Sequence, residues 1–176
     1  RDSYIAMVHA LERERMDGNV SIKLTQLGLD LGPDLCLELT SQIAAAAQAV
    51  GRTIEVDMEG SAYTDATLAI FEAVRRQRDN IALAIQAYLY RSERDIERLQ
   101  PLRPKIRLVK GAYREPKQIA YQKKSDVDAN YRRLLVKLIE GGFSVAIATH
   151  DPAMLDFARA QLRAYQLGED RYEFQM

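Results

Sequence analysis

The stretch Ile106-Arg107-Leu108-Val109-Lys110-Gly111-Ala112-Tyr113 begins as an apolar run and ends in polar residues and a glycine. Short β-branched runs of this kind predict buried strands of a parallel sheet. The same build recurs in five other places, at residues 20–23, 54–59, 81–88, 145–151 and 172–175. In a parallel barrel the carboxyl ends of successive strands meet on one face, where residues distant in sequence surround one ligand. The repeated strand exits therefore predict an enzyme built on a parallel barrel.

Helical patterns separate the runs and are expected at residues 35–50, 65–78, 126–140 and 151–168, with a short helix after Ser92. Asp151-Pro152 supplies an N-cap and a proline at the first helical position, and Ser92 with Asp95 is typical of a capping box. Strands that alternate with helices are joined by right-handed crossovers. The predicted fold class is α/β, a (β/α)8 TIM-like barrel of which this chain supplies about six βα units.

Length and composition limit the possible classes of protein. The chain has 176 residues, whereas a typical (β/α)8 barrel has roughly 250. No linker rich in proline, glycine or serine divides it, so we expect one domain over residues 1–176, a barrel incomplete at both ends. Basic and acidic residues balance at 25 each, which leaves no global field to attract nucleic acid. We see no zinc-ligand spacing and expect no metal, and no apolar run reaches the roughly 18 residues of a membrane span.

Three features are interpreted as structural. Cys36 falls within an apolar helical pattern and is expected to be a buried, inert thiol. His9 lies in an early helical pattern, and Tyr131-Arg132-Arg133 is interpreted as a solvated helix face.

The first three strand exits carry candidate binding residues. Lys23 is interpreted either as an anion-binding lysine or as a lysine at the barrel rim. Asp57 and Glu59 point to the same side by strand alternation and either orient a cation or cap the next loop. The Gln86 amide both donates and accepts hydrogen bonds, which suits a heterocycle with carbonyl and N–H groups. Tyr88 shares the side of Gln86, although aromatic residues at this spacing more often pack in the core.

The later exits carry candidates for anion binding. Arg107 and Lys110 lie on opposite faces of a regular strand, and both reach one ligand only if Gly111 breaks the pleat. Gly111-Ala112 permits close approach of the backbone, whose amides suit a phosphate, although a tight turn alone also explains the glycine. Thr149-His150 precedes a helix N-terminus that favours an anion. A lone histidine is, however, more often structural.

Taken together and in order, the six exits resemble the proline dehydrogenase family. The resemblance covers the chain from about Val20 onward, and the full run from Ile106 to Tyr113 is its most specific part. It implies a distorted (β/α)8 barrel that holds FAD and oxidises L-proline to 1-pyrroline-5-carboxylate by hydride transfer to flavin N5. It also implies a quinone as electron acceptor, with peripheral membrane contact, and no nucleic-acid partner.

The resemblance assigns roles to individual residues. It implies two catalytic residues, Asp57, which orders the pocket, and Arg107, which lies near flavin N5. It places Lys23 and Tyr113 beside the substrate proline. The cofactor contacts that it implies are Met58, Gln86, Arg107, Lys110, Gly111, Ala112, Thr149 and His150.

One departure from the family pattern bears on the substrate site. The family holds the proline carboxylate with an arginine pair on a final helix, and this chain ends before that helix, so we expect further sequence to complete the site. Two other functions fit the pattern, a Schiff-base aldolase barrel that uses Lys110 or Lys23 as its nucleophile and a non-catalytic barrel scaffold. We expect the protein in the bacterial cytoplasm or at the cytoplasmic face of the inner membrane, and in the mitochondrion if it is eukaryotic.

Overall fold

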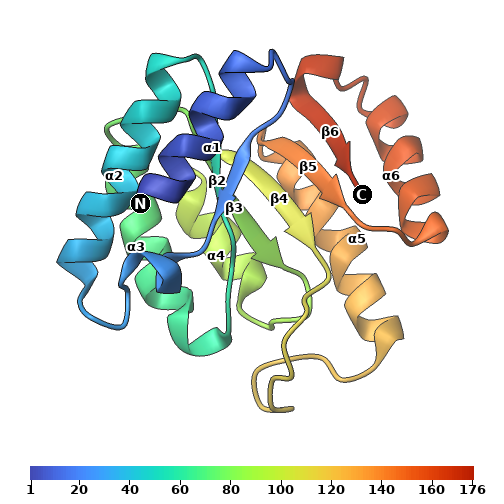
Figure 1. The fold of residues 1–176 in the computed structure, drawn as a ribbon. Coiled ribbons are helices and arrows are strands. Elements are labelled where there is room, and N and C mark those ends of the chain that lie inside the picture. The colour runs from blue at the N-terminus through green and yellow to red at the C-terminus, as the bar shows by residue number, and fades with distance from the viewer. The chain divides into compact units, whose positions relative to one another are not determined.

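Strands and helices alternate along the chain, as the sequence predicts (Figure 1). The computed structural model describes all residues from Arg1 to Met176. The strands are β1 (Val20–Ile22), β2 (Ile54–Val56), β3 (Ile81–Gln86), β4 (Lys105–Val109), β5 (Ser144–Ala148) and β6 (Tyr172–Gln175). The α-helices are α1 (Asp2–Arg13), α2 (Pro33–Ala49), α3 (Thr64–Arg75), α4 (Ser92–Leu99), α5 (Lys124–Glu140) and α6 (Pro152–Ala164). Short 3-10 helices are η1 (Leu24–Leu27), η2 (Ser61–Tyr63) and η3 (Glu169–Arg171).

The strands follow one another in sheet order β1-β2-β3-β4-β5-β6. The chain divides into two compact units, Arg1–Leu83 and Ala84–Met176, and strand β3 runs from the first into the second. The expectation of a single domain stays a prediction. No helix combines the length and the apolar character that a membrane span requires.

In the first unit, β1, β2 and the first half of β3 pair in parallel. Ile22 lies beside Val56, and Val56 beside Leu83. Helix α2 packs against β2, α1 and α3, and its Cys36 is fully buried, which confirms the expectation of a buried thiol. The parallel register brings the ends of β1 and β2 to the same edge, where Lys23 and Asp57 follow the two strands.

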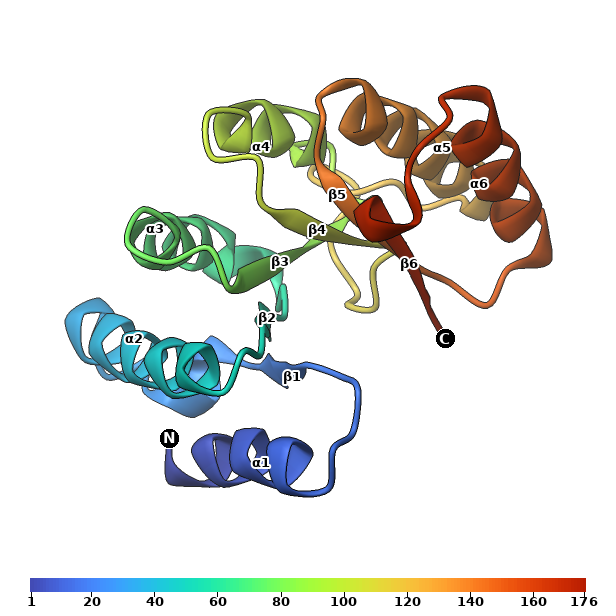
Figure 2. The same ribbon diagram turned by 90° about the horizontal axis from the view of Figure 1, so that it is seen from above.

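In the second unit, β4 pairs in parallel with β5, and β5 with β6. Figure 2 shows α4, α5 and α6 together on one side of these strands. Ile106 and Leu108 are fully buried, and the Leu108 carbonyl accepts a hydrogen bond of 3.1 Å from the Tyr131 hydroxyl of α5. By strand alternation, the half-buried Arg107 and Val109 face the side opposite to α5.

Of the two predicted helix caps, one is confirmed and the other is wrong. The Asp151 N-cap is confirmed, because its carboxylate accepts a hydrogen bond from Ala153 N–H at 3.0 Å and Pro152 begins α6. The capping box at Ser92 is wrong. The Ser92 hydroxyl donates instead to the Gln86 carbonyl at 2.5 Å, and Asp95 binds the Arg91 guanidinium at 2.7 Å. These contacts fix the start of α4 against the end of β3.

The solvated face predicted at residues 131–133 is half correct. Arg132 and Arg133 are exposed, but Tyr131 is fully buried and burial raises the pKa of its hydroxyl. The reason is its position on α5, three residues before the buried Leu134 and seven before the buried Leu138, which places all three on one helix face. Helix α6 also ends at Ala164, before the predicted Gly168.

Candidate active site

Lys23 and Asp57 form an ion pair at the end of β1 and β2. The Asp57 N–H donates to the Ile22 carbonyl at 2.9 Å, which continues the parallel ladder beyond the two strands. The Lys23 ammonium lies 2.5 Å from the Asp57 carboxylate. The lysine side chain is 42% exposed and the aspartate 20%, so the pair presents a cation whose position an adjacent carboxylate fixes.

Glu59 fixes the loop that follows Lys23. Its buried carboxylate accepts hydrogen bonds from the Thr25 N–H at 3.0 Å and the Thr25 hydroxyl at 2.6 Å. The first N–H groups of a helix have no partner within it, and here a residue of the neighbouring strand exit caps η1. Of the two roles predicted for Asp57 and Glu59, Asp57 thus binds a cation, whereas Glu59 caps the loop after β1. Met58, between them, is also buried.

Gln86 ends β3 in a buried position, 2% exposed. Its backbone carbonyl accepts a hydrogen bond from the Ser92 hydroxyl. After Gln86 the ladder with β4 continues, because Ala87 N–H donates to the Val109 carbonyl at 2.7 Å and Tyr88 N–H to the Lys110 carbonyl at 2.9 Å. The end of β3 therefore fixes the backbone of Lys110.

Arg107 lies on the face of β4 that points away from α5. The register places it beside Ala146, and Ala146 beside Glu173. Ala146 is itself fully buried. One position earlier on the same face as Arg107, the Lys105 ammonium binds Glu173 at 2.7 Å. Arg107 and Lys110 therefore lie on opposite faces of β4, as strand alternation predicts.

Lys110 points to the opposite side from Arg107, toward α5. Its ammonium lies 2.5 Å from the Asp128 carboxylate and 2.7 Å from the Asp151 carboxylate. Lys124 binds the same two carboxylates at 2.6 and 2.8 Å. Gly111 therefore does not re-aim the Lys110 side chain to the face of Arg107. The cofactor contact predicted for Lys110 stays a prediction, and only its backbone is placed to make it.

This charge cluster shifts the pKa of its carboxyl groups. Hydrogen bonds from Lys110 and then Lys124 hold the pKa of Asp151 well below its ordinary value. Desolvation acts to raise the pKa of Asp128, but the same two lysines outweigh it and the pKa is lowered. Both carboxyl groups are therefore charged at neutral pH.

Gly111 is required by its backbone and by its neighbour. Its φ of +118° is a conformation that residues with a side chain rarely adopt. A Cβ built on Gly111 would lie only 2.6 Å from Cε1 of Tyr88. Burial, and then the nearby Glu115 carboxylate, raises the pKa of Tyr88 to about 12, so its ring is neutral at physiological pH. Next to Gly111, Ala112 and Tyr113 are exposed and accessible to a ligand.

The long connection from β4 to α5 is pinned a few residues before the helix begins. Leu89 and Ala120 form an antiparallel bridge, in which Tyr90 N–H donates to the Ile119 carbonyl at 3.0 Å and Tyr121 N–H to the Tyr88 carbonyl at 2.8 Å. The rings of Tyr90 and Tyr121 pack edge to face. The segment after Gly111 is thus tied to the end of β3.

Thr149 and His150 lie in the turn between β5 and α6. The buried Thr149 hydroxyl accepts a hydrogen bond of 3.1 Å from Asp151 N–H. His150 is exposed. Asp151 uses one carboxylate oxygen to cap α6 and the other to bind Lys110 and Lys124. The charge cluster therefore holds this turn as well as Lys110.

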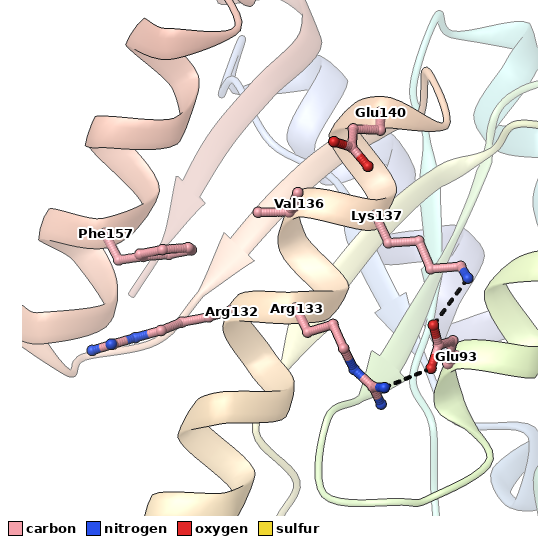
Figure 3. A pocket seen from close by; sticks show the side chains of 7 residues that line it. All are labelled: Glu93, Arg132, Arg133, Val136, Lys137, Glu140 and Phe157. Carbon is pink, nitrogen blue, oxygen red and sulfur yellow. Dashed lines mark hydrogen bonds and ion pairs between the residues drawn. The ribbon is translucent and has the colours of Figure 1, made fainter.

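A groove of about 440 Å³ on the helices of the second unit is separate from these residues (Figure 3). Its lining residues are Glu93, Arg132, Arg133, Val136, Lys137, Glu140 and Phe157. Figure 3 shows Arg133 and Lys137 directed at the Glu93 carboxylate, at 2.9 and 3.1 Å. The Arg132 guanidinium lies 5.3 Å from the centre of the Phe157 ring. The groove contains none of the predicted ligand contacts, and its cations already have partners.

The predicted site residues form one group in each unit. The first unit brings together Lys23 and Asp57, with Met58 next in sequence. The second unit ties the Gln86 end of β3 to the Lys110 backbone, and Lys110 to the turn that contains Thr149 and His150. The second group offers an amide, a guanidinium and exposed backbone beside a glycine, which are donors that suit a large heterocyclic ligand with phosphates.

Replacement of Gly111 by alanine is expected to destabilise the second unit. Gly142 also has a positive φ, of +74°, but no atom lies within 4 Å of the Cβ that it would gain. Gly142→Ala therefore measures the cost of a side chain at a positive φ without a clash, and the excess loss at Gly111 reports the ring contact together with its more extreme φ. Overpacking costs about 1–3 kcal/mol, and the free energy of unfolding in urea should fall by that much more for Gly111→Ala than for Gly142→Ala. Equal losses would mean that the Tyr88 ring moves aside at no cost.

Acid is expected to weaken the charge cluster. Because the folded pKa of Asp151 is the lower one, its stabilising contribution is complete above the ordinary value of 3.8 and is lost as the pH falls below it. Asp151→Asn should therefore lower Tm at neutral pH and show a shallower fall of Tm between about pH 5 and pH 2. Asp156→Asn on the same helix, where the carboxylate is exposed and 3.4 Å from Arg159, is the matched control. Parallel Tm curves for wild type and Asp151→Asn would contradict the expectation.

Comparison with known sequences identifies the family. The sequence model described as proline dehydrogenase matches residues 1–176. Proline dehydrogenase 2 of Bacillus subtilis is 38% identical over 172 residues, which are 98% of this chain and 57% of that protein. A proline dehydrogenase of Deinococcus radiodurans is 38% identical over 180 residues, which cover 99% of this chain and 58% of that protein. The chain thus spans less than two thirds of the length of these relatives.

Solved structures agree on the fold. Proline utilization A (PutA) from Bdellovibrio bacteriovorus superposes with a TM-score of 0.88 at 21% identity, over 99% of this chain and 23% of that one. A PutA variant from Bradyrhizobium japonicum gives a TM-score of 0.82 at the same identity, over 99% of this chain and 21% of that one. The predicted fold class, α/β and part of a TIM-like barrel, is confirmed. By the match along its whole length, this chain belongs to the proline dehydrogenase family.

Proposed function

We propose that the protein oxidises L-proline to 1-pyrroline-5-carboxylate with FAD as its cofactor. The observation that carries the proposal is the family match over residues 1–176. The relatives that share 38% of its residues are named proline dehydrogenases. The two groups of site residues support the proposal by their chemistry.

Lys23 and Asp57 are proposed to act on the substrate side. Free proline carries a carboxylate, and the partly exposed Lys23 ammonium is a cation placed to attract it. Asp57 fixes that ammonium at 2.5 Å, and Glu59 fixes the loop that follows it. Because Asp57 and Glu59 already hold the Lys23 side chain and its loop in place, less conformational entropy would be lost when proline binds. Tyr113, 44% exposed, is proposed to pack against the proline ring.

The second group is proposed to hold FAD. Gln86 would meet the flavin ring through its amide, exposed backbone at Gly111-Ala112 would lie against the cofactor, and Thr149 and His150 would bind its ribose, phosphate or adenine part. Met58 of the first unit is proposed as a further contact. Bound FAD would supply the acceptor for the hydride that leaves the ring carbon beside the proline nitrogen. With loss of the nitrogen proton, that departure leaves the C=N bond of the product.

Arg107 is proposed to be the main electrostatic contributor. Hydride transfer adds negative charge to the acceptor, and a fixed guanidinium nearby stabilises that charge most once it has formed. Strand β4 holds Arg107 beside the small Ala146 and on the face opposite to the Lys110 cluster. Its charge is therefore directed away from the carboxylates that Lys110 and Lys124 bind.

A quinone is the proposed electron acceptor. Quinones reside in membranes, so the protein would make peripheral contact with the bilayer, from the cytoplasm in a bacterium or inside the mitochondrion in a eukaryote.

The structure weighs against the aldolase alternative. Imine formation needs a neutral amine directed at the substrate, whereas Lys110 binds two carboxylates and Lys23 binds one. Borohydride trapping of a carbonyl substrate on either lysine would favour the aldolase nevertheless. A scaffold without catalysis would fail the following assay.

The proposal is tested with the full-length protein reconstituted with FAD. Anaerobic addition of L-proline should bleach the flavin absorbance, and a redox dye should then be reduced in proportion to proline. D-proline and L-alanine serve as controls for the substrate. A yellow protein whose flavin L-proline does not bleach would refute the proposed reaction.

Replacement of Arg107 is expected to slow chemistry more than binding. Arg107→Met should lower the rate constant of flavin reduction by about 100-fold or more, the size of effect found when one electrostatic donor is removed. The proline Kd should change much less, because the charge matters most after hydride transfer. Arg132→Met, on the outer face of α5, is the control. Equal reduction rates in rapid mixing for wild type and Arg107→Met would remove this role.

A further inference from the structure

The charge cluster of Lys110, Lys124, Asp128 and Asp151 is a closed ring of four alternating charges, called the ring below. The carboxylates of Asp128 and Asp151 each bind both the Lys110 and the Lys124 ammonium, through contacts of 2.5, 2.7, 2.6 and 2.8 Å. The ring joins the end of β4, the first turns of α5 and the start of α6. Its formal charges sum to zero, so it adds no net charge beside a ligand.

The ring lies directly next to two segments proposed to bind the cofactor. Lys110 immediately precedes Gly111-Ala112, and Asp151 immediately follows Thr149-His150. These segments are 41 residues apart in sequence where Lys110 meets Asp151. The pairing of β4 with β5 already holds Leu108 beside Ile147, and the contact between Lys110 and Asp151 extends this link beyond the paired residues to the two loops.

The polar atoms of the ring are already used within the protein. The Lys110 ammonium has two carboxylate partners and lies on the face of β4 opposite to Arg107. One oxygen of Asp151 caps α6 while the other binds both lysines. Two of the three N–H groups of each ammonium have carboxylate partners, and these ion pairs suit the lysines to a role in support of neighbouring residues.

We infer that Lys110, Lys124, Asp128 and Asp151 are positioning residues that hold Gly111-Ala112 and Thr149-His150 in the arrangement that binds flavin. The inference rests on the proposed flavin-dependent function and adds to it a set of residues that act through others. A site whose loops are ordered before binding loses less conformational entropy when the ligand arrives. Loss of the ring should therefore weaken FAD binding without slowing chemistry in the protein that has bound it.

The chain offers a matched control for Lys110. Lys137 also binds two carboxylates, Glu93 at 3.1 Å and Glu97 at 2.6 Å, and its side chain is 29% exposed against 23% for Lys110. Lys137 lies on the helical groove of Figure 3, away from both segments. Lys110→Met and Lys137→Met therefore remove the same kind of interaction from two different places.

The experiment measures FAD binding and amide exchange in the full-length protein. Quenching of flavin fluorescence on reconstitution of the apoprotein gives the Kd for FAD, which Lys110→Met should raise by about 2- to 30-fold, the usual range for residues that couple to a site without touching the ligand. Lys137→Met should leave it unchanged. Hydrogen exchange of peptides covering residues 111–123 and 149–153 should accelerate in apo Lys110→Met and not in Lys137→Met.

A second variant separates the ring from the helix cap. Asp151→Asn keeps an oxygen that can accept from Ala153 N–H but loses the charge that binds the lysines. It should raise the FAD Kd as Lys110→Met does, and the double variant should raise it by less than the product of the two single effects, because both remove the same ion pair.

The outcomes separate this inference from the proposed reaction. Equal FAD Kd values for Lys110→Met and Lys137→Met, or unchanged exchange in both segments, would overturn the positioning role even if L-proline is oxidised. Slower flavin reduction at saturating FAD with an unchanged Kd would also overturn it, because Lys110 would then act at the reacting atoms. A wild-type protein that binds FAD but does not oxidise proline would refute the reaction and leave the ring to be judged on Kd and exchange. A wild-type protein that does not bind FAD would overturn both.

Discussion

The alternation of side chains along β4 is the constraint on which the second unit depends. Hydrogen bonding to a parallel neighbour fixes the pleat, and successive residues must then face opposite sides. Leu108 and Lys110 face α5, where one is buried in the core and the other is neutralised by carboxylates. Arg107 faces the other side beside Ala146. A shift of one residue would put the arginine in the core and the leucine on the face that is proposed to bind the cofactor.

Hydrogen bonds extend this order beyond the ends of the strands. The ladders continue through Asp57 in the first unit and through Tyr88 in the second, so residues that follow a strand inherit its geometry. Side chains then fix the loops, with Glu59 as the cap of η1 and Ser92 as the anchor of the Gln86 carbonyl. The site residues are thus held by neighbouring side chains, which fix the geometry that a binding site needs.

The sequence predicted the strands, most helices and the Asp151 cap, because each has a local signal in periodicity or capping chemistry. It did not predict partners separated by tens of residues, such as Thr25 with Glu59 or Lys110 with Asp151, since these depend on how elements pack. The burial of Tyr131 was visible in principle from its spacing to Leu134 and Leu138, but the adjacent arginines favoured a polar interpretation. The contact of Gly111 with the Tyr88 ring left no signal beyond the glycine itself.

The bridge between Leu89 and Ala120 affects how the chain can vary in length. It divides the connection from β4 to α5 into an exposed first part and a short return to the helix. The entropy of closing a loop rises only slowly with its length, so residues inserted at the exposed Arg114 cost little folding free energy, because the carbonyls that accept hydrogen bonds begin at Glu115. Insertion next to the buried Ala120 would instead break the bridge and displace Val127 at the start of α5. The exposed part is the place where this protein can diverge in length while the strand before it and the helix after it keep their positions.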